Sequence, residues 1–197
     1  MALLTVLATS AASAETDSFS GVTAGALPAG WVCGVTGKGS PKWAVEADGS
    51  RNVLRQSGSG TFPWCVKNEV SITDGFVEVR FRPEKGREDQ AGGIVWRWQD
   101  GDNYYVARAN ALENNVSLYY TAKGRRNTLE YVDAPVPGNV WHTLRVEFAG
   151  KRIKVLLDGK PCIEMDDEHF PKPGAIGVWT KADSVTAFSE FSYGALK

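Results

Sequence analysis

The stretch that decides the fold is Phe76-Val77-Glu78-Val79-Arg80-Phe81-Arg82, in which apolar and charged side chains alternate. Successive side chains of an extended strand point to opposite faces, so Val77, Val79 and Phe81 share one face. The charged side chains that alternate with them share the other face. This alternation predicts a β-strand with one face in a core and the other turned away from it.

The same two-residue period returns along the chain, between turns rich in glycine and proline. Residues 141–148 and 153–157 alternate in this way, and Ala149-Gly150-Lys151 and Asp158-Gly159-Lys160 are hairpin signals. Many short strands without a helical period predict an all-β fold, two antiparallel sheets packed as a jelly-roll sandwich. Further strands are predicted over residues 43–47, 52–56, 91–98, 103–110, 115–121, 127–132, 174–181 and 184–193.

Length and charge indicate how many domains the chain forms and which partners it is not expected to bind. The chain has 197 residues, 22 Lys and Arg against 23 Asp and Glu, and a net charge of -1. This length suits one domain, predicted over residues 16–197. Because phosphate backbones are bound by clustered excess cations, the charge balance argues against a nucleic-acid partner. No apolar run reaches the roughly 18 residues of a spanning helix, so we expect no membrane insertion.

Residues 1–14 differ in composition from the rest of the chain. An apolar run is followed by small residues that end in Ala12-Ser13-Ala14, the pattern of a secretory signal peptide and its cleavage site. A positively charged start is missing, and a merely apolar N-terminus is the alternative. A signal peptide predicts a secreted or periplasmic protein that begins near Glu15.

The three cysteines fit an oxidising compartment. Cys33 and Cys65 flank a stretch rich in Gly, Ser and Trp, and we expect a disulfide between them. Cys162 is then unpaired and is expected to be a small buried hydrophobe. The spacing matches no zinc pattern, and only His142 and His169 could add ligands, so no metal site is predicted here.

Aligning the strands by parity separates two sets of side chains. One set is apolar, and the set on the opposite faces contains Arg, Asn, Tyr and Trp. Aromatic rings stack on sugar CH groups, and Arg and Asn side chains hydrogen-bond hydroxyls in pairs. The second set predicts a concave sheet that binds carbohydrate through Arg80, Arg97, Arg108, Asn110, Tyr119, Trp179 and Lys181. The alternative is a solvated sheet face with Arg–Glu pairs, which stabilise little. The apolar set is expected to fill the space between the sheets: Val77, Val79, Phe81, Ala107, Val116, Leu118, Tyr120, Ile176 and Val178.

Two acidic segments suggest other chemistry. Glu164, Asp166 and Glu168 would share one face of a strand, as the carboxylates of retaining glucanases do, but the prolines that follow favour a solvated turn. Asp100-Gly101-Asp102-Asn103 has closely spaced oxygen ligands that could hold calcium, although a hairpin turn is favoured. We therefore expect no cofactor, with calcium as the open alternative.

A likeness to a known superfamily is carried by residues 92–97, 102–110, 114–119, 141–146 and 174–184. They look like the laminin G-like branch of the concanavalin A-like lectin/glucanase superfamily, and their order is similar to the bacterial domain family labelled 3-keto-disaccharide hydrolase. The second resemblance implies glycoside cleavage. The resemblance identifies no active site in this chain. The only approximate match to the glucanase signature is Glu164, Asp166 and Glu168, near the end of the sequence.

Two hypotheses about function follow. The first is an exported carbohydrate-active domain that binds or hydrolyses a glycoside on its concave face. If it is an enzyme, Glu78 beside Arg80 and Arg108 is the predicted catalytic acid or base, because the two cations would lower its pKa and hold substrate oxygens. The second is a non-catalytic laminin G-like recognition or adhesion module.

Overall fold

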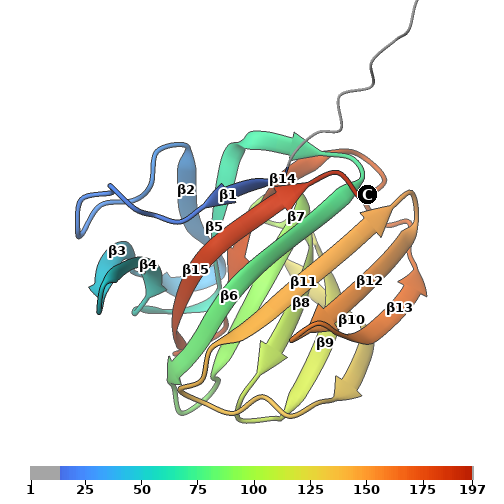
Figure 1. Ribbon diagram of the computed structural model, residues 1–197. Coiled ribbons are helices and arrows are strands. Elements are labelled where there is room, and N and C mark those ends of the chain that lie inside the picture. Colours follow the sequence, from blue (N-terminus) through green and yellow to red (C-terminus); the bar gives the residue numbers. More distant parts are fainter. Residues whose placement is uncertain (1–13, 197) are drawn as a thin grey trace, which may run out of the picture.

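The structure, a computed structural model, describes residues 14–196. The predicted signal peptide lies outside these residues except for Ala14. Within residues 14–196 the structure contains β-strands and no helix. The strands form two antiparallel sheets that pack face to face (Figure 1). The predicted all-β jelly-roll sandwich is therefore confirmed. This part of the chain has no helix of the length and apolarity that crossing a bilayer requires.

Neighbouring strands in the two sheets are often far apart in the sequence, as a jelly roll requires. Sheet A contains, in spatial order, β13 (Lys160–Asp166), β12 (Arg152–Leu157), β11 (His142–Ala149), β6 (Gly75–Lys85), β15 (Val185–Gly194), β4 (Arg51–Gln56) and β3 (Trp43–Asp48), and β1 (Glu15–Asp17) also pairs with β15. Sheet B contains β10 (Arg125–Asp133), β9 (Asn115–Ala122), β8 (Asn103–Asn110), β7 (Ala91–Asp100), β14 (Gly174–Trp179), β5 (Ser59–Ile72) and β2 (Trp31–Ser40).

The core lies between the sheets and is built by the alternating apolar positions. Val77, Val79 and Phe81 of β6 are fully buried in it. The other members of the predicted apolar set belong to the same cluster, with Tyr120 half-buried at its margin. For the strands that carry these residues, alternation therefore predicted correctly which side faces the opposite sheet.

Two long strands, β2 and β5, were not predicted. β5 contains Gly60, Pro63 and Cys65 and shows no clean alternation, so its local sequence does not indicate a strand. Pairing supplies what local sequence lacks, because β5 is hydrogen-bonded to β2 on one side and to β14 on the other.

Cys33 and Cys65 lie directly opposite each other on β2 and β5 and form a disulfide. The predicted bridge is therefore confirmed. Cys65 is fully buried in the core, so the bridge ties the edge strand β2 to the interior of sheet B. Cys162 is a free, half-buried cysteine on β13.

We predict that the double variant Cys33→Ala/Cys65→Ala loses about 2–4 kcal/mol of the free energy of unfolding, because the bridge restricts the unfolded chain. Its partners are separated by 32 positions. Urea titration followed by tryptophan fluorescence measures the loss. The control, Cys162→Ala, should lose much less, and a double variant as stable as the wild type would contradict the prediction.

Candidate functional site

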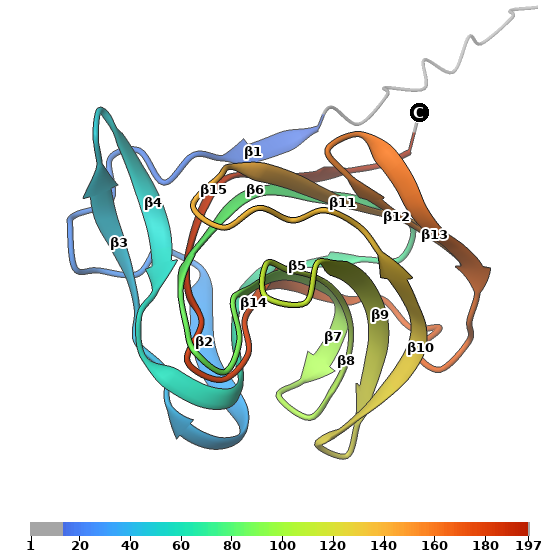
Figure 2. The same ribbon diagram turned by 90° about the horizontal axis from the view of Figure 1, so that it is seen from below.

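The face of sheet B that is turned away from sheet A, here called the outward face, carries one row of side chains across five strands. Register places Trp64 of β5 opposite Trp179 of β14, and Trp179 opposite Gly93 of β7. Gly93 lies opposite Arg108 of β8, which lies opposite Ser117 of β9. Opposed residues point to the same face, so the row is continuous. Figure 2 shows sheet B bent with this face on the inside of the curve.

Five predicted substrate-binding residues meet at this face, although they come from distant parts of the chain. Arg108 and Asn110 lie on β8, Tyr119 on β9 and Trp179 on β14, and Lys181 lies two residues after the end of β14. Hydrogen bonds and ring contacts join all five into the clusters described next. The structure brings these five residues together, and their role in binding a sugar stays a prediction.

Asp89, in the loop before β7, is the centre of the charged cluster. Its carboxylate is 0% exposed and accepts hydrogen bonds from Lys181 Nζ at 2.8 Å and from Asn110 Nδ2 at 3.0 Å. Arg108 Nη1 is 3.4 Å from the same carboxylate. Burial raises the pKa of Asp89, although the hydrogen bond from Lys181 and the charge of Arg108 act to lower it.

The cluster continues to the edge of the sheet through the second nitrogen of Arg108. Nη2 donates to Glu113 Oε2 at 2.5 Å and to Asn115 Oδ1 at 3.1 Å. Asn115 Nδ2 in turn donates to Glu113 at 2.8 Å and to the Tyr131 hydroxyl at 2.5 Å. Partial burial acts to raise the pKa of Glu113, but the hydrogen bond from Asn115 and the charge of Arg108 lower it. Arg108 is thus held rigidly between two carboxylates.

An aromatic box lies beside the charged cluster. The rings of Phe62 and Trp179 stack with their centroids 5.6 Å apart. The guanidinium of Arg126 lies 4.8 Å from the Phe62 ring centroid, 4.3 Å from that of Tyr119 and 5.9 Å from that of Trp179. Trp179 and Tyr119 are buried beneath this cover, so Phe62 and Arg126 are the members of the box that solvent reaches.

A hollow of about 410 Å³ opens next to both clusters. Phe62 of the box, Lys181 of the charged cluster and Arg126 all line it, together with the exposed Lys38 and Glu88. A hollow that combines an apolar ring with a few fixed hydrogen-bonding groups is the usual form of a small-ligand site.

Reasoning from the sequence missed three central residues. Asp89 lies in a loop, Phe62 lies on an unpredicted strand, and Arg126 precedes the strand predicted over residues 127–132. The parity argument compared predicted strands only, so it had no means of placing any of the three. Nothing in the local sequence around a charged loop residue such as Asp89 indicates that the fold will bury it.

Glu78 and Arg80 were expected beside Arg108, and the structure separates them from it. Both lie on β6 in sheet A, on the face away from the core. Glu78 is 3.5 Å from Arg145, and Arg80 is 3.3 Å from Glu190. These are the cross-strand pairs of a solvated face. The expected grouping was wrong because parity identifies the side of a strand and not the sheet to which it belongs. The catalytic role of Glu78 stays an untested prediction.

Arg97 also lies apart from the outward face. It has a positive φ of 46° at an irregularity of β7 and is 1% exposed. Its guanidinium donates to the carbonyl oxygens of Thr73, Phe170 and Gly150, at 3.1, 3.1 and 2.7 Å. Arg97 therefore joins three loops. Its N–H groups donate to backbone carbonyls of these loops and are not free to bind a sugar.

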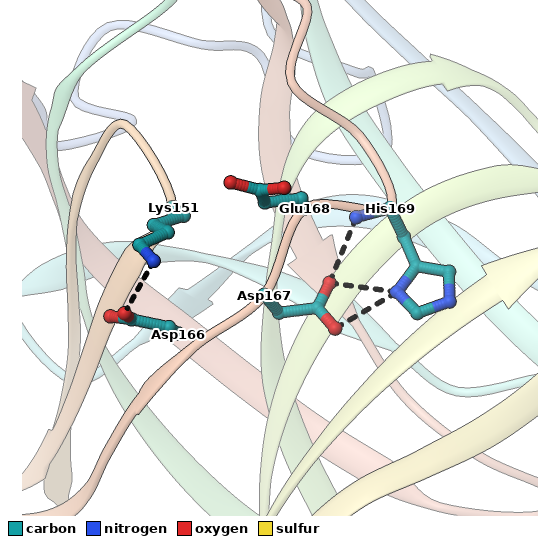
Figure 3. Close-up of a pocket in the computed structure, with 5 residues that line it drawn as sticks. All are labelled: Lys151, Asp166, Asp167, Glu168 and His169. Atoms are coloured by element: carbon teal, nitrogen blue, oxygen red, sulfur yellow. Dashed lines mark hydrogen bonds and ion pairs between the residues drawn. The ribbon is translucent and has the colours of Figure 1, made fainter.

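A second hollow, of about 490 Å³, lies where β13 ends (Figure 3). The strand ends at Asp166, so Glu164, Asp166 and Glu168 do not form a catalytic row on a strand. Lys151 pairs with Asp166 at 3.2 Å. His169 directs Nδ1 at the Asp167 carboxylate, 2.8 Å from Oδ2.

This His–Asp pair is held from both sides. The Tyr105 hydroxyl donates a hydrogen bond to Asp167, and the imidazole of His169 stacks on Tyr120 with ring centroids 3.6 Å apart. Burial acts to raise the pKa of Asp167, but the hydrogen bonds from Tyr105 and His169 lower it. Nδ1 faces the carboxylate, which leaves Nε2 on the far side of the ring (Figure 3).

The remaining polar candidates are structural. The β7–β8 connection is a hairpin turn in which Asp100 accepts hydrogen bonds from the Asp102 backbone at 2.8 Å and from Asn103 Nδ2 at 2.8 Å. His142 is buried between the Asp158 carboxylate, 2.8 Å from Nδ1, and the Pro137 carbonyl, 3.0 Å from Nε2. Within residues 14–196, no three His, Cys, Asp or Glu side chains are grouped as metal ligands.

Comparison with known families agrees with this architecture. The family model of the 3-keto-alpha-glucoside-1,2-lyase-like domain matches residues 19–191. The chain belongs to this family. The match covers every strand from β2 to β14 and most of β15, so both clusters of the outward face and the His169 hollow lie within the domain.

Members of other groups are similar in sequence or shape. A levanase of Bacillus subtilis is 26% identical over 136 residues, which are 68% of this chain and 18% of that protein. The chain thus spans less than a fifth of the levanase. A carbohydrate-binding module of Bacillus subtilis, CBM66, superposes with a TM-score of 0.72 at 22% identity, over 84% of this chain and 96% of the module. A glycoside hydrolase (GH16) of Bacteroides ovatus gives 0.62 at 10% identity, over 90% and 98%. The two structures share the jelly-roll fold with this domain.

Asp183 holds the loop that carries Asp89. Its carboxylate accepts hydrogen bonds from the backbone N–H groups of Arg87, Glu88 and Asp89, at 2.7, 3.0 and 3.1 Å. These bonds, that of Arg87 foremost, lower the pKa of Asp183 below its ordinary value of 3.8. A carboxyl group with a lowered pKa stabilises the fold above its unfolded-state pKa, and the contribution is lost as the pH falls through the folded-state pKa.

We therefore predict that Asp183→Asn lowers the melting temperature at about pH 6 and that its deficit against the wild type narrows towards about pH 3. Thermal melts followed by circular dichroism at several pH values measure the difference. Asp102→Asn, which changes an exposed turn carboxylate, is the control. A deficit that stays constant over this range would show that the charge of Asp183 does not hold the loop.

Proposed function

We propose that the outward face of sheet B binds carbohydrate, and that the 410 Å³ hollow is where the sugar enters. The observation that carries the proposal is the convergence of Lys181, Arg126 and Phe62 at that hollow. A pyranose or furanose ring presents apolar CH groups beside hydroxyls. An aromatic ring next to fixed cationic donors matches both.

The charged cluster would act by positioning. Asp89 holds Lys181 at 2.8 Å, and Arg108 and Asn110 hold Asp89 from beneath. Because Arg108, Asn110, Tyr119 and Trp179 are buried, we assign them to the support of the site, and Lys181, Arg126 and Phe62 to the contact with sugar. Preorganised donors bind without the entropy loss of ordering long side chains.

Several observations support an exported protein. The Cys33–Cys65 disulfide is typical of oxidising compartments. Jelly-roll carbohydrate-binding modules such as CBM66 share the fold. We propose that residues 1–14 are the signal peptide and that residues 16–197 form the exported domain. In this proposal the protein is a recognition domain for an extracellular or periplasmic glycan.

A second candidate function is favoured by the His169–Asp167 pair. The family name describes a 1,2-lyase for 3-keto-alpha-glucosides. In such an elimination a base removes the C2 proton, which the neighbouring ketone makes acidic; the electron pair of the C2–H bond forms the C1–C2 double bond while the C1–O bond breaks. His169, oriented by Asp167 at 2.8 Å, is a histidine that could take this proton on Nε2. The proton then passes from the imidazolium to the leaving oxygen.

For the binding function, we predict that Lys181→Met and Phe62→Ala each weaken binding at least tenfold, or about 1.4 kcal/mol. The measurement is affinity electrophoresis and calorimetry with a panel of neutral and acidic polysaccharides that includes levan and mixed-linkage β-glucan. Lys160→Met, which removes the same charge from the exposed first residue of β13, is the control. Wild-type protein that binds no member of the panel, or variants that bind as tightly as the control, would overturn the proposal.

For the elimination function, we predict that His169→Asn lowers turnover of a 3-keto-alpha-glucoside by about 10²–10⁴-fold, the usual contribution of a general base. Release of the aglycone is the measurement, and the Lys181→Met protein serves as a matched variant in the other hollow. Glu78→Gln tests the remaining sequence prediction in the same assay. An unchanged rate in His169→Asn would exclude His169 as the base.

A further inference from the structure

The outward face of sheet B has more positive than negative charge. Its cations are Arg108, Arg126 and Lys181, and the carboxylates that pair with them are Asp89 and Glu113. Both carboxylates already form ion pairs. Asp89 pairs with Lys181 and Arg108, and Glu113 pairs with Arg108. One positive charge, that of Arg126, is left without a counter-charge.

Arg126 is half-buried, and its partners differ from those of Arg97 and Arg108, the two arginines that the fold buries. Among residues 14–196 its guanidinium has no carboxylate partner, and its buried Nη1 atom has no hydrogen-bond acceptor. By contrast, Arg97 donates to three carbonyls and Arg108 to two carboxylates. Burying a charge without a partner is unfavourable, because the charge loses its hydration. The rings of Phe62, Tyr119 and Trp179 compensate in part through cation–π contacts.

The surroundings of Arg126 add further positive charge. Arg126 and Arg108 contact the same Tyr119 ring, at 4.3 and 5.7 Å from its centroid. Burial, together with the positive charge of Arg108, lowers the pKa of Arg126. The hollow that Arg126 lines also holds Lys38 and Lys181, against the single carboxylate of Glu88. An anion that entered the hollow would therefore meet three cations at once.

We infer that the saccharide bound at this face carries an anionic group, a carboxylate or a sulfate ester, which Arg126 receives. The inference rests on the proposed function and specifies its ligand class. A planar guanidinium matches the two oxygens of either group in a bidentate pair. Lys181 and Lys38 lie on the same hollow and would add to the attraction, while the Phe62 ring receives the apolar face of the sugar.

The experiment compares each acidic polysaccharide with its own neutral form. The probes are polygalacturonate before and after reduction of its carboxylates to alcohols, and dextran sulfate beside dextran, each at two salt concentrations. We expect the wild type to bind one of the two acidic probes at least tenfold more tightly than its neutral form. Which acidic probe binds distinguishes a carboxylate from a sulfate.

Variants of two adjacent arginines provide the matched control. Arg126→Gln is expected to abolish the preference for the acidic probe, and Arg126→Lys, which keeps the charge and loses the planar fork, to reduce it. Arg125→Gln removes the same charge from the exposed neighbouring residue and should keep the preference. If Arg126→Gln does not fold, the wild-type comparison of acidic and neutral probes still decides.

The outcomes separate the inference from the proposal on which it rests. Equal binding to the acidic and neutral forms overturns the inference and leaves carbohydrate binding intact. An acidic preference that Arg126→Gln and Arg125→Gln reduce equally also overturns it, since it would then reflect net charge. Binding to no acidic or neutral polysaccharide overturns the proposed function itself.

Discussion

The buried carboxylate of Asp89 is the interaction on which the proposed site depends. Asp89 belongs to a loop between the two sheets, yet its carboxylate lies beneath the outward face of sheet B and holds Lys181, Asn110 and Arg108. An ionised carboxylate stays in such a place only when its oxygens are hydrogen-bonded and its charge is matched. The three partners meet this condition, and in meeting it they are themselves fixed.

The fold keeps that loop in position from outside. Asp183 accepts three backbone hydrogen bonds from the segment that ends in Asp89. Asp183 and Lys181 both follow β14, so the segment after this strand holds the loop by its backbone and by its buried carboxylate. Sheet B and the loop from sheet A are thus joined at the position where the 410 Å³ hollow opens.

The two hollows differ in the chemistry that they present. The first combines cations with a stacked aromatic pair, which suits recognition of a sugar and its substituents. The second presents a histidine oriented by a carboxylate, which suits proton transfer. Because they share no lining residue, the proposed binding and the proposed turnover can be tested by separate substitutions. The family to which the domain belongs is named for a lyase, whereas the CBM66 structure with a TM-score of 0.72 is a binding module.

The sequence by itself determined the strands with clean alternation, the core side of each, and the Cys33–Cys65 bridge. Side-chain direction along a strand follows from backbone geometry alone, so Val77 or Leu118 could be assigned to the core without coordinates. Only the tertiary structure decided which strands are neighbours. It separated Glu78 from Arg108, enclosed Arg97 among loop carbonyls, and brought Asp89, Phe62 and Arg126 to the outward face. The physical reason is that strand order in a jelly roll depends on long-range pairing, and residues in loops or irregular strands such as β5 carry no local periodicity that reveals their partners.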